Sequence, residues 1–528
     1  MKRKWSVPLC LLTLVCLLCV SANAEEAPVI VEQPCTGIIQ DGDFPEAPQP
    51  GLQMYASAQS ADDALADVKA ALKQGLLEMK ASLDISQYGI SVKTFRDIYP
   101  QVINENPELF FVEGGCTYQS MGEIVSNVLP NYLWGKESFN ELTEEQKSQI
   151  RQKQTALEQV INGILAQVDP DWSDLEKALF LHDYLATHAQ YDETLQIRDA
   201  YTILVEGTGV CQAYTLAYRL LLNRVNITSG TVTSTSLNHI WNILLIDGNW
   251  YHVDVTWDDP TEDRIGQSQH VYFCLSEDKL KATNNGAHNA HDFKYSLNVK
   301  TDDKTFDNYY WANVDSAFVP LNGKWYYLLY QSGLMQTEDP KQAGSLKKQI
   351  NTDWYVWMNG SDYWLGLYSG LSRYNDALIY NTPDAVYSYD PENAKEAQAV
   401  YTLTPEERSK GYIYGTVVDG NVLRYAVQQD PDHSMSTYTH RLDPYTTVTA
   451  GGYAYYLEGK TLYLKLSGTQ SGSVIAAWYS EEDKLLGILI LNEGELTADV
   501  SDAKTVKIFA AANTDYHPLC EATVRTIG

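Results

Sequence analysis

Two apolar runs on either side of Asp247-Gly248 constrain the fold of this chain more than any other feature of its sequence. The runs HIWNILLI (residues 239–246) and WYHVDVTW (residues 250–257) are rich in aromatic and β-branched residues, which favour strands. Asp-Gly between two such runs is typical of a two-residue type I′ turn, because both central residues of that turn need a positive φ. The sequence therefore predicts an antiparallel β-hairpin over residues 239–257.

The length of that turn decides which side chains share a face of the hairpin. With a two-residue turn, Asp254 lies opposite Trp241 and one diagonal step from His239, on the same face. A diagonal of this kind is about 7–8 Å between Cα atoms, so the two side chains can lean together. A three-residue turn would move Asp254 to the opposite face. A histidine oriented by this carboxylate is therefore expected only if the turn is even-numbered.

The stretch GTGVCQAY (residues 207–214) places a cysteine at the predicted start of a helix. A helix N-terminus presents unpaired N–H groups and partial positive charge, which favour a thiolate and can stabilise an oxyanion. A thiolate nucleophile also needs a base within reach and a group that orients this base. We expect Cys211 to be the nucleophile, His239 the base and Asp254 the orienting group. Gln212 is a candidate oxyanion donor, and the alternative is that its side chain points to solvent.

Taken together, these motifs resemble the core of the transglutaminase-like superfamily. The resemblance rests on LHDYLATHAQYD, GTGVCQAY and NHIWNILLIDGNWYHVDVTWDDP, and it covers about residues 173–260. It implies a papain-like arrangement in which Cys211 is the nucleophile, His239 the general base and acid, and Asp254 the orienting residue. The superfamily includes peptidases, amide cross-linkers and members without activity, so the resemblance leaves the reaction open. NENPELFFV and the helices before it resemble the segment that precedes this core in exported proteins of Gram-positive bacteria.

The first residues have the pattern of a secretory signal peptide. A basic start is followed by an apolar run over residues 7–20 and by the small-x-small sequence ANA over residues 22–24. We expect residues 1–24 to be removed by cleavage near Ala24, which leaves a secreted or cell-wall-associated protein with no membrane segment. The formal net charge of −30 argues against nucleic acid and anionic membrane surfaces as partners, since both need basic patches.

Beyond the signal peptide, the sequence predicts several domains. Residues 25–50 are rich in Pro, Glu and Gly and are expected to form a flexible lead-in, and residues 51–170 are expected to form a helical segment. Capping-box patterns mark two helix starts, one at Thr143 with Gln146 and one at Ser173 with Glu176. The fold class that we expect is an α+β papain-like core preceded by the helical segment and followed by β-rich modules. Three segments are expected from there on: the transglutaminase-like core over 171–300, a β-meander or propeller-like module over 301–445, and a β-sandwich over 446–528.

Other residues near these motifs also have plainer interpretations. His182 is expected to be a hydrogen-bonded core histidine, because it lies on the apolar stripe of its helix. His252 shares a predicted sheet face with Asp254 and is a rival orienting group or base. His288 and His291 form an H-x-x-H pattern without the helix and glutamate of a metalloprotease, so we expect no metal and no cofactor.

The tryptophans and the remaining cysteines leave alternatives open. Trp241 and Trp257 flank the expected triad and are candidate walls of a substrate cleft, with plain core packing as the alternative. Taken alone, Cys211 is better explained as a small buried hydrophobe, and only its two partners favour catalysis. Five cysteines follow the signal peptide without regular spacing, which excludes a disulfide scaffold: Cys35, Cys116, Cys211, Cys274 and Cys520.

The reaction expected from these residues is acyl transfer at an amide bond of a protein or peptide. We favour a cysteine peptidase or amidase over a protein-glutamine gamma-glutamyltransferase, because water is abundant outside the cell and no feature of the sequence excludes it. The rival class is a non-catalytic cell-surface module whose β domains bind cell-wall or extracellular polymer. NGKWYYLLYQSGLMQT (residues 322–337) resembles one repeat of aromatic cell-wall-binding modules, and an ordinary aromatic hairpin is its alternative.

Overall fold

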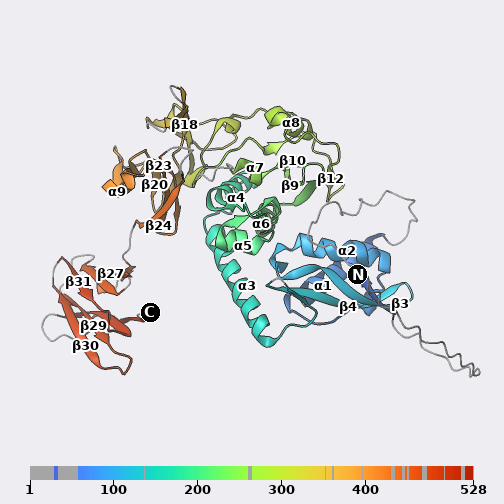
Figure 1. Cartoon of the computed structure of the whole chain (residues 1–528), viewed down its shortest axis with the longest axis horizontal. Coiled ribbons are helices and arrows are strands. Elements are labelled where there is room, and N and C mark those ends of the chain that lie inside the picture. Colours follow the sequence, from blue (N-terminus) through green and yellow to red (C-terminus); the bar gives the residue numbers. More distant parts are fainter. Residues whose placement is uncertain are drawn as a thin grey trace, which may run out of the picture. The chain divides into compact units, whose positions relative to one another are not determined.

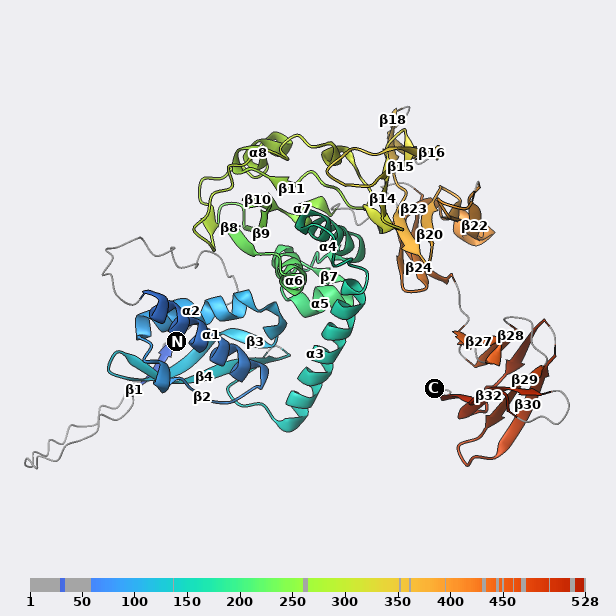
Figure 2. The same cartoon turned by 180° about the vertical axis from the view of Figure 1, so that it is seen from behind.

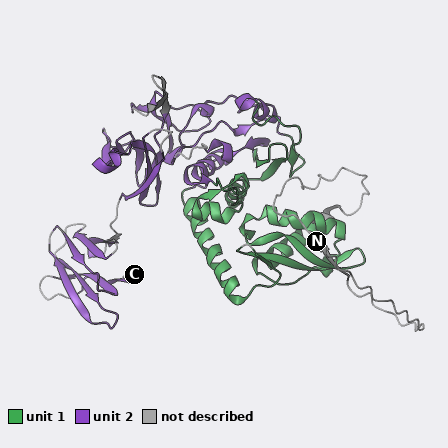
Figure 3. Cartoon of the chain, in the orientation of Figure 1, with its two compact units in different colours: residues 1–167, 192–245, 286–300 green, residues 168–191, 246–285, 301–528 purple. Residues whose placement is uncertain are grey.

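The computed structural model divides the chain into two compact units (Figure 3). Unit 1 comprises residues 1–167, 192–245 and 286–300, and unit 2 comprises residues 168–191, 246–285 and 301–528. The structure describes residues 29–33, 58–135, 137–259, 265–350, 353–359, 362–394, 396–429, 434–442, 446–448, 451–458, 460–466, 472–492, 494–512 and 518–526. Within these ranges, no helix is both long and apolar enough to cross a membrane. The expected signal peptide lies outside them.

The first part of unit 1 consists of two helices and an antiparallel sheet (Figure 1, Figure 2). The helices α1 (Ala58–Leu77) and α2 (Val92–Glu105) were expected from periodicity. The sheet has the order β1-β3-β4-β2, with β5 paired to β4. Its strands are β1 (Val29–Gln33), β2 (Leu83–Asp84), β3 (Val112–Met121), β4 (Ile124–Trp134) and β5 (Glu137–Phe139).

Helices and sheet of this region share one apolar core, which includes Leu72, Val102 and Tyr118. The sequence predicted a helical segment, and the structure adds the sheet to it. β1 falls within the residues that were expected to form a flexible lead-in, and it pairs with β3 in an antiparallel register.

The two predicted capping boxes are confirmed. α3 (Glu144–Leu165) in unit 1 begins after Thr143, which exchanges reciprocal hydrogen bonds with Gln146. α4 (Asp174–His188) in unit 2 begins after Ser173, which does the same with Glu176. Each box satisfies N–H groups that have no partner inside the helix. Most of α4 is buried.

The cysteine motif lies in unit 1. α5 (Ala200–Glu206) is followed by α6 (Cys211–Arg224), which begins at the residue predicted from the sequence. The strand β8 (Ser229–Ser234) pairs antiparallel with β9 (His239–Ile246) on one side and with β12 (Lys294–Tyr295) on the other.

A two-residue turn follows β9 and leads into unit 2. Asp247 and Gly248 have φ angles of 51° and 85°, and β10 (Asn249–Val253) begins at the next residue. Two successive positive φ angles are the signature of a type I′ turn, so the predicted even-numbered turn is confirmed. The elements that follow are α7 (Val255–Asp258), β11 (Phe273–Leu275), which pairs antiparallel with β10, and α8 (Glu277–Ala282).

Beyond residue 300, unit 2 consists mainly of antiparallel sheets, as the sequence predicted. Four successive sheets are formed by β13 to β16, β17 and β18, β19 to β22, and β23 to β25. Their bounds are Val319–Leu321, Lys324–Leu329, Gly333–Thr337, Ser345–Lys348, Asp353–Asn359, Asp362–Leu367, Leu371–Tyr374, Ala377–Asn381, Ala385–Tyr389, Gln398–Thr402, Tyr412–Asp419, Val422–Gln428 and Ser436–Arg441, with α9 (Pro405–Arg408) after β22. The aromatic stretch 322–337 forms the β14–β15 hairpin.

The last part of unit 2 contains two four-stranded sheets, β26-β27-β28-β31 and β30-β29-β32-β33. Residues from both sheets, among them Tyr455, Leu464, Val474 and Ile508, belong to one apolar cluster. The strand bounds are Thr446–Val448, Tyr453–Glu458, Thr461–Leu466, Gly472–Tyr479, Leu485–Leu491, Glu495–Asp499, Thr505–Ala512 and Thr523–Thr526. The domain boundaries expected from the sequence stay predictions.

Candidate active site

Cys211 is the first residue of α6, and the chain reaches it through a tight approach. Gly207 ends α5 in the left-handed conformation with φ 79°. A Cβ at Gly209 would lie 2.4 Å from the Cβ of Ala213, so only glycine fits where this segment passes the first turn of α6. Val210 is the N-cap of α6 and supplies no side-chain acceptor. The first N–H groups of the helix are therefore not capped from Val210 and remain suited to an anion.

Hydrogen bonds attach the first turn of α6 to the start of β9. Thr215 lies one turn beyond Cys211, and its hydroxyl is 2.8 Å from the Cys211 carbonyl oxygen and 3.0 Å from that of Ile240. The Asn242 side-chain amide donates to the Thr215 carbonyl oxygen at 3.1 Å. Residues four apart share a face of a helix. Cys211 and His239, which immediately precedes Ile240, are thereby held at neighbouring ends of these two elements.

His239 is half-buried and lies among aromatic rings of unit 1. Its ring stacks with Trp241 at a centroid distance of 5.5 Å and meets His288 edge-on at 5.6 Å. Trp241 also contacts His288 and Phe293, at centroid distances of 5.4 and 4.9 Å. These contacts fix the plane of the His239 ring. His288 is a neighbour that sequence reasoning considered only as part of a metal motif.

Asp292, which directly follows the H-x-x-H segment, has a structural role. Asp292 accepts hydrogen bonds from the Ser234 hydroxyl at 2.6 Å and from the N–H and hydroxyl of Ser236, both at 2.8 Å. These bonds, with that of Ser234 the strongest, hold the pKa of the Asp292 carboxyl well below its usual range. Asp292 therefore fixes its loop to the end of β8.

Asp254 is placed by unit 2 at the junction of β10 and α7. The strand expected over residues 250–257 ends at Val253, and residues 255–258 form α7 instead, so the expectation that Asp254 lies on this strand is wrong. It is the N-cap of α7, and its carboxylate accepts the Trp257 N–H at 3.3 Å. Its own N–H donates to the Tyr272 carbonyl oxygen at 3.2 Å. The Asp254 side chain is buried, and backbone hydrogen bonds hold the residue at the start of α7. The role of Asp254 as the partner of His239 stays a prediction.

Gln212 follows Cys211 and is 2% exposed. Its Oε1 has no hydrogen-bond partner among the described residues. A buried amide oxygen without a partner is costly, so its presence here calls for an explanation other than stability. The buried position excludes the alternative in which Gln212 points to solvent.

The two tryptophans differ in exposure. Trp241 is 1% exposed, and this burial favours core packing over a role as a cleft wall. Trp257 is 39% exposed and meets the Tyr272 ring edge-on at a centroid distance of 5.5 Å. An exposed tryptophan next to a candidate catalytic residue remains suited to substrate contact.

The rival histidines of unit 2 are buried and hydrogen-bonded. His252 Nε2 lies 2.9 Å from the Thr301 hydroxyl. His182 is bonded at both ring nitrogens, to Asp183 and to Asp258, so its expected core position is confirmed. Neither ring has the partial exposure that a base acting on substrate needs.

The described cysteines are thiols rather than half-cystines: Cys116, Cys211, Cys274 and Cys520. Cys116 and Cys274 are buried, and burial raises the pKa of the Cys274 thiol. Cys211 and Cys520 are half-buried. A nucleophilic role for Cys211 requires a reduced, reachable sulfur, and both conditions hold.

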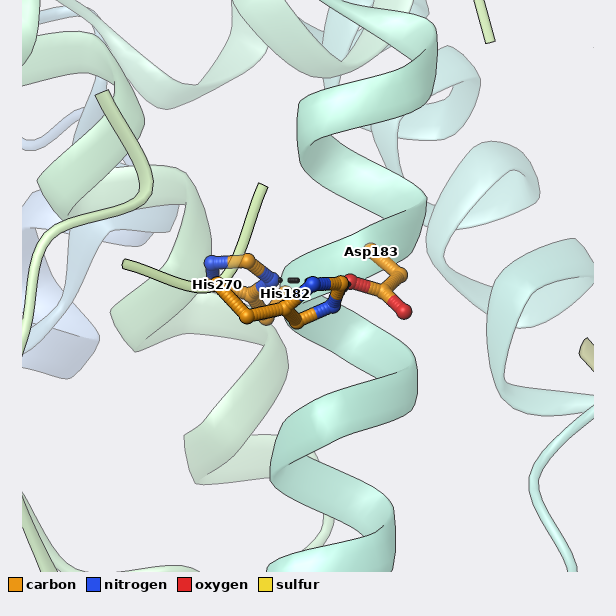
Figure 4. Close-up of side chains that lie close together, drawn as sticks. All are labelled: His182, Asp183 and His270. Atoms are coloured by element: carbon orange, nitrogen blue, oxygen red, sulfur yellow. Dashed lines mark hydrogen bonds and ion pairs between the residues drawn. The ribbon is translucent and has the colours of Figure 1, made fainter. Parts of the chain in front are cut away.

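One group in unit 2, His182, Asp183 and His270, has ligand atoms close enough to hold a metal ion (Figure 4). Asp183 Oδ1, however, already accepts hydrogen bonds from His182 Nδ1 at 2.9 Å, His270 Nε2 at 2.7 Å and Ser268 Oγ at 2.9 Å. A tetrahedral zinc ion with ligands at about 2.0 Å would hold these atoms about 3.3 Å apart. The geometry is therefore that of a hydrogen-bonded carboxylate.

Comparison with known proteins identifies this region. The model of the transglutaminase-like superfamily matches residues 160–255, which include Cys211, His239 and Asp254. No curated protein matches the chain. A solved structure described as "Crystal structure of a TGase" matches at 14% identity with a TM-score of 0.18, over 30% of this chain and 46% of that chain. The chain thus spans less than half of that structure, and so low a TM-score adds no argument. Residues 160–255 of this chain belong to the transglutaminase-like superfamily.

Proposed function

We propose that the chain is a cysteine enzyme that cleaves amide bonds through a thioester at Cys211. The observation that carries the proposal is the position of Cys211 at the uncapped start of α6, attached through Thr215 to the strand that begins with His239. A nucleophile and its base must lie within hydrogen-bond reach of each other, and this attachment supports such a pairing.

In the proposed reaction, His239 takes the Cys211 proton and the thiolate attacks the carbonyl carbon of an amide. The oxyanion that forms is stabilised by N–H groups of the first turn of α6 and by the Gln212 side-chain amide, since one such donor contributes about 10²- to 10³-fold in rate. The C–N bond breaks, His239 returns the proton to the amine, and a thioester remains. Asp254 holds the imidazole in the tautomer that this transfer needs.

Water then attacks the thioester, and His239 takes a proton from it and returns one to Cys211. The products are a carboxylic acid and the free enzyme. Attack by an amine at the same step gives transamidation, so the two reactions differ only in the second nucleophile. We favour hydrolysis, because Cys211 and His239 are only half-buried and water outside the cell is abundant.

The proposed substrate is a protein or peptide outside the cell. Export is proposed from residues 1–24, with cleavage near Ala24, and sequencing the N-terminus of the mature protein tests it directly. Contact of the C-terminal sheets with cell-wall polymer is proposed only as an accessory to the amide chemistry.

Glutamine-containing casein and a labelled primary amine separate the two outcomes. We expect casein fragments without amine incorporation, and neither product with Cys211→Ser. Amine incorporation without fragments would make the protein a cross-linker. Fragments formed equally by Cys211→Ser would remove Cys211 from the mechanism.

A further inference from the structure

A chain of buried hydrogen bonds in unit 2 is not used by the mechanism above. His182 Nδ1 lies 2.9 Å from Asp183 Oδ1, and His182 Nε2 lies 3.2 Å from Asp258 Oδ2. His270 Nε2 lies 2.7 Å from the same Asp183 oxygen, and His270 Nδ1 lies 3.0 Å from the Val314 carbonyl oxygen. Figure 4 shows how the two rings approach Asp183. All four residues are buried.

The identity of these partners decides where the protons are. Carboxylate and carbonyl oxygens only accept hydrogen bonds, so a ring nitrogen that bonds to one must carry a proton. Both nitrogens of His182 and both nitrogens of His270 face such oxygens. The geometry therefore places the His182 ring between two carboxylates as a donor at both nitrogens, which is the hydrogen-bonding pattern of an imidazolium.

The electrostatics of the cluster agree with this assignment. Burial disfavours a charged His182, but its hydrogen bonds and charge pairs with Asp183 and Asp258 outweigh burial and raise its pKa to about 9. Burial likewise disfavours an ionised Asp183, yet His270 and His182 hold the pKa of its carboxyl well below its usual range. The second Asp183 oxygen accepts the Phe318 N–H at 2.6 Å.

Hydrogen bonds connect this cluster to Asp254. The Asp258 carboxylate, which binds His182, also accepts the Tyr272 N–H at 3.0 Å. The Asp258 N–H donates to the Asp254 carbonyl oxygen, and the Asp254 N–H donates to the Tyr272 carbonyl oxygen, both at 3.2 Å. The backbone of Asp254 is thus bonded on both sides to residues whose places Asp258 fixes.

We propose that His182, Asp183 and His270 form a positioning cluster that sets the start of α7, and with it the Asp254 carboxylate, for the orientation of His239. This inference rests on the proposed function, in which Asp254 orients the base. The three residues act through Asp258 and do not contact substrate, so they are positioning residues.

The cost of the cluster supports a role beyond stability. Well-packed apolar residues of similar volume are often as stabilising as a buried ion pair or more so, because desolvation opposes the pairing. Stability alone would therefore be served by apolar side chains at these positions. Charged groups with directional bonds fix a geometry that apolar packing leaves looser.

The protonation of the cluster can be tested without reference to any reaction. In the full chain labelled with ¹⁵N-histidine, NMR at pH 8 should show the His182 ring with protons on both nitrogens. His182→Gln should remove this signal, whereas His440→Gln, at a half-buried position in β25, should not. A neutral His182 ring at pH 8 would overturn the proposal. The proposal would also be overturned if native mass spectrometry detected one equivalent of bound zinc in the wild type and none in His270→Gln.

The positioning role is tested by the pH profile of Cys211 alkylation with iodoacetamide. We expect His182→Gln to shift the profile in the same direction as Asp254→Asn and to slow alkylation at pH 6 by about 10- to 100-fold. The double variant His182→Gln/Asp254→Asn should be alkylated no more slowly than Asp254→Asn alone, because both changes act on the same carboxylate. His270→Gln serves as the second variant if His182→Gln does not fold.

The failures of the two proposals are distinguishable. A lower melting temperature with an unchanged profile in both glutamine variants would make the cluster a purely structural device and overturn its positioning role. If the wild-type Cys211 reacts no faster than Cys520, the proposed function fails and the positioning role fails with it. The NMR result then still decides whether the His182 ring is charged.

Discussion

The helices α4 and α6 both carry residues suited to catalysis, but they begin in opposite ways. At the start of α4, Ser173 Oγ accepts the Glu176 N–H at 3.3 Å and the Glu176 carboxylate accepts the Ser173 N–H at 2.9 Å. At the start of α6, Val210 offers no side-chain oxygen. α4 holds His182 and Asp183 in its buried middle, whereas α6 holds a half-buried Cys211 at its first position.

The difference shows why residues suited to catalysis have a structural role in α4 and a candidate chemical role in α6. His182 and Asp183 have all their hydrogen-bonding positions filled by protein atoms, so neither can exchange a proton with a substrate. Cys211 lies at a helix start that no Val210 side-chain oxygen caps, so the N–H groups of this turn are suited to an incoming oxyanion. The candidate site is therefore distinguished by a helix start without a side-chain cap, and not by the mere presence of residue types suited to catalysis.

The largest expected effect comes from removing the nucleophile. Cys211→Ser should lower the turnover of a peptide substrate by about 10⁴-fold or more, because the residues of such a site act as a unit. The melting temperature should stay at the wild-type value, since serine fits the same volume. Cys520→Ser, at the other half-buried thiol, is the matched control and should retain full turnover.

Removing one member of the buried cluster should also lower the stability of the folded chain. His182→Ala leaves Asp183 and Asp258 buried with fewer donors, and loss of one partner of a buried charge pair costs about 3–5 kcal/mol. The free energy of unfolding of the core, measured in urea, should fall by that amount. A change below about 1 kcal/mol would show that the pairing contributes little. His440→Gln controls for the loss of a histidine elsewhere.

A substitution at Gln212 should affect two reactions of the Cys211 sulfur, amide cleavage and alkylation, to different extents. Gln212→Ala should slow amide turnover by about 10²- to 10³-fold if its amide stabilises the oxyanion. Alkylation by iodoacetamide forms no tetrahedral oxyanion, so its rate at Cys211 should stay nearly constant. Equal slowing of both reactions would mean that Gln212 supports the helix start instead.

The cluster also predicts a pH window of stability. The pKa of His182 is raised from 6.5 to about 9 in the folded chain, so its contribution is full below about pH 6.5 and is lost as the pH rises through 9. The melting temperature of the wild type should therefore fall between pH 7 and pH 9.5 by more than that of His182→Gln. Parallel curves for the two proteins would contradict the charged state of this ring.

The smallest effect is expected at the capped helix start. Ser173→Ala removes the capping oxygen of α4 and should lower the free energy of unfolding by about 1 kcal/mol. Thr143→Ala, at the equivalent box of α3, should lower it by a similar amount. Neither change should alter Cys211 alkylation, because neither helix start carries the site.

Local signals in the sequence predicted much of this structure. The Asp247-Gly248 turn, the start of α6 at Cys211 and both capping boxes depend on residues a few positions apart, and each is found where expected. β3 was missed because its inward positions include the small or polar residues Gly114, Cys116 and Ser120, so hydrophobic alternation does not reveal a strand. A strand buried through small residues lacks the pattern on which such a prediction depends.

The buried cluster could not be predicted from spacing. Its members are separated by 76 residues between His182 and Asp258 and by 87 residues between Asp183 and His270. His182 was expected in the core from its helix position alone, but nothing in the sequence pairs it with these partners. His288 was noticed only within H-x-x-H, because its contact with the His239 ring arises from tertiary packing.

The alkylation rate of Cys211 at pH 6 tests the central claim most directly. Peptide mapping after a short exposure to iodoacetamide compares Cys211 with Cys520, which is similarly half-buried and has no predicted histidine partner. We predict that Cys211 reacts at least about 10-fold faster, since a thiolate at a helix start beside a base forms well below the ordinary thiol pKa near 8.5. His239→Ala should remove this advantage. Equal rates at the two cysteines, or an advantage that survives His239→Ala, would contradict the account.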